Sequence, residues 1–177
     1  MNKTNTLLIR KGDDGAVKNT FTQWGICCAK VPFKAGGETK DVPSRNFPDE
    51  DGEYSFIPKS LKMKAYNAEF EFVYSGEELA QNIMNLSHAL TQIEAFKAWL
   101  TGNDDPTNYP DGTGAELTIY SPYSNIGRKG CYLVSFSDEE PCVIAKGRGS
   151  TLYNENVVTF KGTFRVTDPV TQVTLSE

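Results

Sequence analysis

The feature that most constrains the fold is a regular alternation of apolar and polar residues within the segment 61–74. The apolar positions share one face of an extended chain and the polar positions share the other: Tyr66, Ala68, Phe70, Phe72 and Tyr74 against Asn67, Glu69 and Glu71. Successive side chains of a β-strand point to opposite faces, so this pattern predicts a strand with one packed face and one solvated face. Such strands are typical of antiparallel sheets.

A long amphipathic helix is predicted directly after this strand. Ser75 followed by Glu78 matches a capping box, which marks a helix N-terminus. Over about 24 residues, apolar side chains recur every three or four positions: Leu79, Ile83, Leu86, Leu90, Ile93, Phe96 and Leu100. Gly102 is the expected stop, and Trp99 is expected to seal the end of the stripe. The stripe predicts a helix that covers the sheet.

Further strands and two long loops complete the expected fold. The predicted strands are 7–10, 21–30 with a break at Gly25, 115–121, 131–136, 142–146 and 156–167, with residues 122–130 as a turn. Gly162 within the last strand suggests a bulge or a close backbone approach. Residues 41–60 are expected to be an extended, acidic loop and residues 103–114 a polar loop. Both are candidate arms for contacts with neighbouring copies.

These elements predict an α+β, mainly β fold, in which an antiparallel β-sandwich or partly open barrel carries one long packed helix. We expect one domain over residues 1–177, since this length fits a single domain. Residues 41–177 would form its core, and residues 1–40 would supply strands whose placement the sequence leaves open.

Net charge is −5 and the isoelectric point is near 5.0, which gives no electrostatic footprint for nucleic acid or an anionic membrane. The N-terminus lacks the apolar stretch of a signal peptide, and no segment has the length of a membrane span. We therefore expect synthesis in the cytoplasm, with no nucleic-acid or membrane partner.

The residue types needed for catalysis are sparse. His88 is the only histidine and lies off the apolar stripe, so a histidine-based catalytic pair or zinc site is not expected. The adjacent Cys27 and Cys28 do not have metal-site spacing, and buried reduced thiols are the expected state of all four cysteines. A disulfide between Cys131 and Cys142 is the alternative. We predict no enzyme activity and no cofactor.

The acidic run Asp49-Glu50-Asp51 raises the question of a cation site. An EF-hand needs ligands at alternate positions and a distant glutamate, which this run does not supply. A solvated acidic loop with no bound metal is therefore expected.

Three motifs, in the order of the predicted elements, give the chain a family resemblance. They are the strand Phe70-Glu71-Phe72-Val73-Tyr74, the helix end Trp99-Leu100-Thr101-Gly102 and the segment Tyr120-Ser121-Pro122-Tyr123. Their order resembles bacteriophage and prophage tail proteins, especially the N-terminal part of distal tail proteins, over residues 40–170.

The resemblance implies a β-sandwich with one packed helix, whose subunits form a six-membered ring that joins the tail tube to the baseplate or hub. The implied partners are further copies and other tail proteins (tube, baseplate or hub), first in the host cytoplasm and then in the virion tail. Two departures matter: residues 1–40 match nothing in the family, and the second domain of many distal tail proteins has no counterpart here. Tube and terminator proteins share parts of this architecture, so the position within the tail stays open.

Four residues are candidates for an assembly interface. Tyr109, Tyr120 and Tyr123 are aromatic anchors of the kind that interfaces favour, and Arg128 is a candidate for an ion pair across the interface. The alternative is that the three tyrosines lie over the domain's own core.

The alternative function is a monomeric β-sandwich carbohydrate-binding module. Its site would need aromatic side chains exposed on a flat face. Trp24 and Trp99 are the only tryptophans available for it, and Trp99 is expected at the helix end.

Overall fold

The computed structural model describes residues 5–34, 37–49, 51–74, 86–110, 114–137, 140–146 and 153–177. Its elements are β1 (Leu8–Lys11), β2 (Lys18–Asn19), α1 (Thr20–Trp24), β3 (Ile26–Lys30), β4 (Ser44–Arg45), β5 (Tyr54–Ser55), β6 (Tyr66–Tyr74), α2 (Leu86–Thr101), β7 (Leu117–Ser121), β8 (Ile126–Phe136), β9 (Glu140–Lys146) and β10 (Tyr153–Val166).

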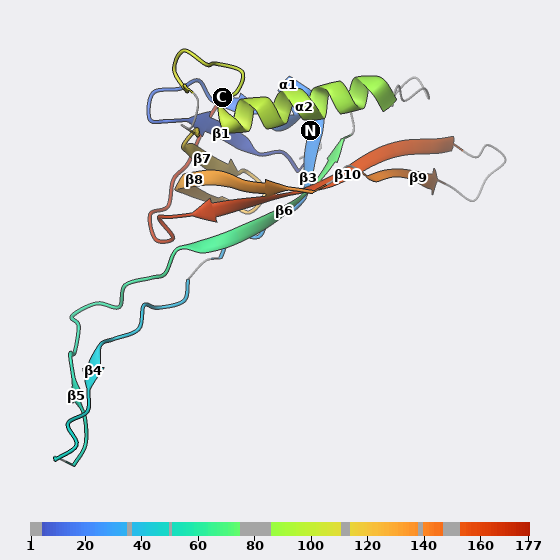
Figure 1. Ribbon diagram of the computed structural model, residues 1–177. Helices are drawn as coiled ribbons and strands as arrows, with labels where there is room; N and C mark the ends of the chain where they lie inside the picture. The colour runs from blue at the N-terminus through green and yellow to red at the C-terminus, as the bar shows by residue number, and fades with distance from the viewer. Residues whose placement is uncertain are drawn as a thin grey trace.

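Eight of the described strands form one antiparallel sheet in the order β2-β1-β7-β8-β10-β6-β3, with β9 paired to the first half of β10. The sheet curls: the Cys28 amide of β3, at one end of this order, donates to the carbonyl of Asn5, which precedes β1 near the other end (2.6 Å). The result is a half-barrel whose inner face is covered by α2 (Figure 1). The predicted class, α+β and mainly β, is confirmed.

The core lies between α2 and the inner face of β6 and β10. Every second side chain of β6 is buried, as the alternation predicts. Phe72 stacks on Phe160 of the neighbouring β10 (5.2 Å between ring centroids). A Cβ on Gly162 would lie 3.2 Å from the Phe72 ring, which is the close approach predicted for this glycine. The register between β10 and β8 shifts just beyond it, between Thr163 and Phe164.

The second half of the predicted helix is confirmed. Ile93, Phe96 and Leu100 are fully buried. Gly102 ends the helix with a φ of 88°, and His88 is exposed. Leu90 was predicted to be buried, but it is 36% exposed, and Ala89 takes the inner position instead. The capping box at Ser75 and the stripe positions 79 and 83 lie outside the described residues.

The predicted strand 21–30 is wrong in its first half, which is the short helix α1. Asn19 caps this helix, because its side-chain oxygen accepts from the Phe21 amide at 2.9 Å. Gly25 ends it in the left-handed region, with a φ of 69°. The single turn brings Trp24 onto Phe96 of α2, 5.1 Å between ring centroids. Apolar periodicity cannot separate so short a helix from a buried strand.

Several predicted boundaries also move, by two residues at the starts of β7 and β9 and by more at those of β6, β8 and β10. Residues 126–130, predicted as part of a turn, begin β8, and only residues 122–125 form the turn. Residues 61–65 precede β6 rather than belonging to it, and β10 begins at Tyr153 rather than 156. Backbone pairing extends β8 and β10 beyond the predicted strands, whereas the strand predicted over 61–74 was too long at its start.

The strand register excludes the Cys131–Cys142 disulfide. Cys131 pairs with Val166 and Cys142 pairs with Val157, so their partners lie nine residues apart on β10. At ~3.3 Å per residue, that separation is about 30 Å. Cys131 is instead a free, buried thiol.

Candidate assembly interface

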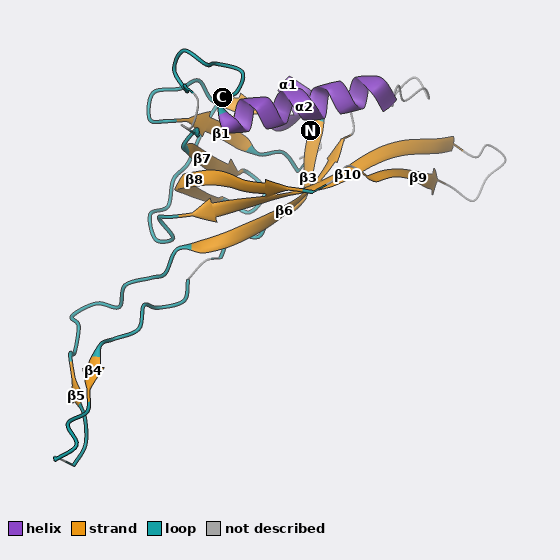
Figure 2. Cartoon of the chain, in the orientation of Figure 1, coloured by secondary structure: helices purple, strands orange, loops and turns teal. Residues whose placement is uncertain are grey.

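A two-stranded arm, residues 38–64, leaves the barrel between β3 and β6 and projects far beyond it (Figures 1 and 2). Its two sides are joined by backbone hydrogen bonds, from Lys64 to Glu38 at 2.7 Å and from Lys40 to Lys62 at 2.6 Å, and farther out by the pairing of β4 with β5. The segment predicted as a loop is therefore a ladder of paired chains; residue 50 lies outside the described residues.

Prolines explain why this ladder is sparse. Pro43, Pro48 and Pro58 lack the amide hydrogen that a ladder needs, and each favours an extended conformation of the residue before it. Gly52, with a φ of 99°, supports the reversal at the tip. The arm is thus extended, but its regular strands are only two residues long.

The arm exposes its apolar side chains. Five of the ten exposed large apolar side chains found in the described residues lie on it: Val42, Phe47, Phe56, Ile57 and Leu61. Phe56 is 66% exposed and Ile57 is 88% exposed. Val42, Phe56 and Leu61 also line a shallow groove of about 200 Å³ along the arm. Apolar surface concentrated in this way marks an interaction site.

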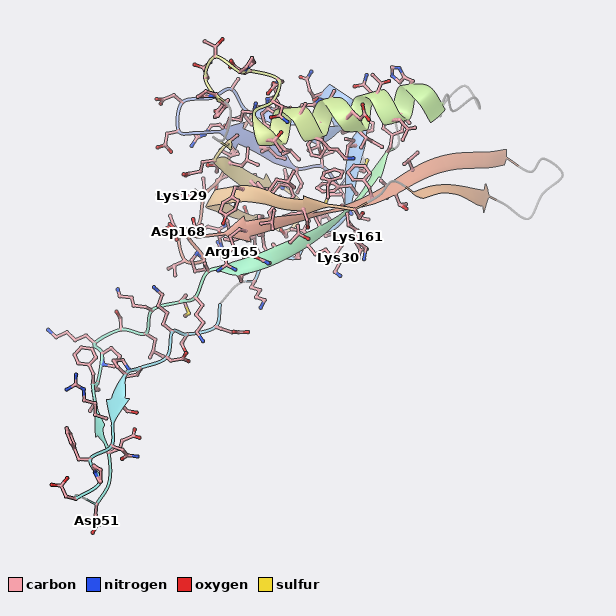
Figure 3. The ribbon with its side chains drawn as sticks, in the orientation of Figure 1. Lys30, Asp51, Lys129, Lys161, Arg165 and Asp168 are labelled. Atoms are coloured by element: carbon pink, nitrogen blue, oxygen red, sulfur yellow. The ribbon has the colours of Figure 1, made fainter. Side chains whose placement is uncertain are left out.

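The end of the arm is acidic. Asp49, Asp51 and Glu53 are all exposed there, and Figure 3 shows Asp51 at the far end. Among the residues that the structure describes, no three His, Cys, Asp or Glu side chains are grouped to hold a metal ion. The tip therefore presents negative charge to a partner surface or to solvent.

The outer face of the sheet carries an excess of positive charge. Lys161 pairs with Glu69 at 3.2 Å, and Lys30 pairs with Glu71 at 3.3 Å. Arg165 lies on the same face, since it is in register with Asn67 of β6, so three cations stand beside two carboxylates (Figure 3).

The same face has exposed apolar side chains on β8. Tyr132 is 46% exposed and lies in register with Arg165, and the nearby Val134 is 51% exposed. Together, Lys30, Tyr132, Val134, Lys161 and Arg165 are called the outer face below. The outer face is apolar and cationic, whereas the arm is apolar along its length and acidic at its tip.

Tyr109 and Tyr120 are engaged within the chain. Tyr120 is 8% exposed, and its hydroxyl donates to the Asn125 side chain at 2.8 Å. Tyr109 is half-buried against the core, with the Lys11 ammonium 5.1 Å from its ring centroid. These placements fit the alternative that the tyrosines pack over the domain's own core. Tyr123, 69% exposed, has the surface position that an interface anchor needs.

Arg128 is likewise directed into the chain. It is only 3% exposed, and its guanidinium donates to the Gln172 side chain at 2.6 Å and to the Lys34 carbonyl at 3.0 Å. Residues 41–60 were a candidate contact arm from the sequence, but the apolar side chains Phe56 and Ile57 were not singled out within it. The signal was present in Phe56-Ile57, two large apolar residues between charged and proline-rich stretches.

Both tryptophans and the cysteines Cys28 and Cys131 are buried, so they are not available for glycan binding or catalysis. Trp24 and Trp99 are buried and lie 5.1 Å apart, so neither offers an exposed platform. Burial raises the pKa of the Cys28 and Cys131 thiols to about 12, which keeps both protonated at neutral pH.

Within the described ranges, no helix combines the length and apolar character needed to cross a membrane. The chain was compared with protein-family models and with curated proteins, and neither comparison gave a match.

Proposed function

We propose that this chain is a structural subunit that assembles with further copies of itself, the arm of one copy packing on the outer face of the next. The observation that carries the proposal is the arm, which projects from the barrel and exposes Phe56, Ile57 and Leu61. A pair of strands without a covering layer is marginally stable in water. A second protein surface would supply that layer.

The energetics favour association. Fully burying a side chain such as Phe or Ile contributes roughly 1.5–3 kcal/mol, so a few arm residues can offset part of the entropy cost of association. Asp51 and the other acids of the tip would face Lys161 and Arg165 of the neighbour. The tip cannot reach this face within its own copy, because the arm points away from the barrel (Figure 3).

The geometry favours a ring or a filament. The arm and the outer face are two different surfaces, and a contact between different surfaces repeats head to tail until it closes or continues. The resemblance to distal tail proteins supports closure into a six-membered ring. On this proposal the ring joins tail tube to baseplate or hub in a phage or prophage tail, after assembly in the host cytoplasm.

The test is solution mass by light scattering over a range of concentrations, with negative-stain images of the same samples. We expect a mass of about six subunits and ring-shaped particles. The double variant Phe56→Ser/Ile57→Ser should remain monomeric. Val170→Ser is the matched control, since Val170 is 67% exposed but lies outside the arm, and it should assemble like the wild type.

Two results would contradict the proposal: a wild-type monomer at every concentration, or rings that form equally well in the double variant.

A wild-type monomer would direct attention to the carbohydrate-binding alternative, with Tyr132 as the exposed aromatic residue on a flat face. Binding of a glycan by that monomer would then replace the assembly proposal. High salt should weaken true arm docking, since it screens exposed charges.

A further inference from the structure

The last ten residues form a segment that crosses the end of the barrel from which the arm leaves (Figure 1). Residues 168–177, here called the strap, begin with a turn in which Asp168 accepts from the amides of Val170 and Thr171, at 3.2 and 3.0 Å. This turn redirects the chain immediately after β10 ends. The strap therefore starts beside Tyr66, which pairs with the last residue of β10.

The strap is bound to the start of β8. The Val173 amide donates to the Gly127 carbonyl at 3.3 Å, and the Gln172 side chain donates to the Asn125 carbonyl at 2.8 Å. A Cβ added to Gly127 would collide with the Val173 carbonyl oxygen. Glycine is thus what allows the strap to lie this close to the sheet.

The far end of the strap is anchored by packing. Leu175 is 6% exposed and belongs to a small apolar cluster with Leu8 and Tyr120, apart from the main core. The strap is consequently held at both ends, by the Asp168 turn and by Leu175, and by hydrogen bonds between them.

Arg128 links the strap to the root of the arm. One guanidinium nitrogen donates to the strap at Gln172 (2.6 Å), and the other donates to the Lys34 carbonyl (3.0 Å), at the end of the chain that leads into the arm. The Lys34 amide donates in turn to the Tyr66 hydroxyl at 3.3 Å, where the arm returns into β6. A buried guanidinium must keep its hydrogen bonds, so these acceptors are held in a fixed relation.

A second observation places the same two parts side by side. Pro169 of the strap is buried, and its Cβ lies 3.7 Å from the position that a Cβ on Gly37 would occupy. Gly37 immediately precedes the arm. The strap thus lies beside the arm root as well as being linked to it through Arg128.

We propose that the strap and Arg128 form a positioning device that fixes the direction in which the arm leaves the barrel. Displacement of the strap would leave the barrel intact and free the arm to swing. The positioning device itself does not depend on the proposed function. Only its consequence does: the direction of the arm determines whether it can reach a second copy.

Two variants disrupt the device at different points. Gly127→Ala pushes the strap away at Val173, and Arg128→Met removes the polar link while keeping a long side chain. Val170→Ala is the control, because Val170 lies in the strap but is 67% exposed. All are made in the Phe56→Ser/Ile57→Ser background, and the couplings are recorded at concentrations at which light scattering shows a monomer, so the measurement does not depend on the proposed function.

The measurement is a set of residual dipolar couplings for backbone amides of the barrel and the arm. In the parent protein and in Val170→Ala, arm and barrel couplings should fit one alignment. In Gly127→Ala and Arg128→Met, the arm couplings should fall to about half or less, since motion relative to the barrel averages them, while barrel couplings stay unchanged.

Arm couplings that stay at the parent values in either variant overturn the inference, because it requires both the strap and Arg128. If Arg128→Met does not fold, Gln172→Ala takes its place, since it removes the strap's acceptor without altering the buried guanidinium. Self-association of the unmutated protein is measured separately, so failure of this inference and failure of the proposed function are distinguishable.

Discussion

Two glycines with similar backbone angles differ in what surrounds them. Gly102 and Gly52 have φ values of 88° and 99°, which only glycine adopts without strain. A Cβ on Gly102 would lie 2.6 Å from the Tyr109 ring, whereas a Cβ on Gly52 would meet nothing within 4 Å. The helix end therefore needs glycine both for its positive φ and for the close approach of Tyr109. The arm tip needs glycine only for its positive φ.

Gly102→Ala is expected to lower the free energy of unfolding by about 2–4 kcal/mol, from left-handed strain together with the clash against Tyr109. Gly52→Ala, which carries only the strain, should cost about 1 kcal/mol or less. Urea denaturation of the two variants measures the difference. Equal losses of unfolding free energy in the two variants would show that the Tyr109 side chain moves aside without destabilising the protein.

Asp168 gives the strap a dependence on pH. Its pKa is lowered, first by the hydrogen bond from the Thr171 amide, so this carboxylate stabilises the folded state when ionised. The contribution is fully present above the unfolded pKa of about 3.9 and is lost as pH falls through the lower folded value. Asp168→Asn should therefore be less stable than wild type at pH 6, and the gap should close toward pH 2.5. A gap that is independent of pH in thermal unfolding would argue against this role.

At the scale of elements, periodicity predicted faces better than it predicted boundaries. The alternation in β6 placed each side chain correctly, because a strand has only two faces. The stripe in α2 placed Ile93 and Phe96 correctly but not Leu90, since a helix surface is continuous and a residue at the edge of a stripe can face either way. The helix α1 escaped prediction because one turn carries no periodicity, although Asn19 and Gly25 mark its two ends.

The edge of that stripe can be tested within one helix. Ile93→Ala should reduce the free energy of unfolding by about 2–5 kcal/mol, because Ile93 is fully buried. Leu90→Ala is the matched control and should cost less than about 1 kcal/mol, since Leu90 is 36% exposed. Similar losses from denaturant titrations would mean that α2 is rotated relative to the packing described.

At the scale of the whole molecule, the sequence indicated the barrel and marked residues 41–60 as a candidate contact arm, but it did not predict that the two sides of the arm pair. The apolar side chains of the barrel are buried within the same chain, so hydrophobic periodicity in the sequence predicts its strands and helix. Residues 41–60 were expected to be a loop because their prolines and charges break every pattern. The individual interface residues were harder to predict: Phe56 and Ile57 of the arm stay exposed, whereas Tyr120 and Arg128, which were candidates for the interface, are buried.

The arm should be dispensable for folding. Thr39 and Met63 face each other across its base, so residues 40–62 can be replaced by the two-residue turn Asn-Gly. The buried core includes no residue of the arm, so the free energy of unfolding should change by less than about 1 kcal/mol. Calorimetry measures this, and light scattering should show a monomer. A large loss of stability would mean that the arm supports the barrel.

The placement of the two tryptophans determines what an optical experiment on this protein can observe. Trp24 and Trp99 lie side by side under the Lys18 ammonium, 5.4 and 5.0 Å from their ring centroids, where α1 meets the end of α2. The fluorescence of the two tryptophans therefore reports on the packing of α1 against α2. Docking of the arm on a neighbouring copy would not change this packing. Constant tryptophan fluorescence while the oligomer mass rises would therefore show that subunits associate without rearranging their cores.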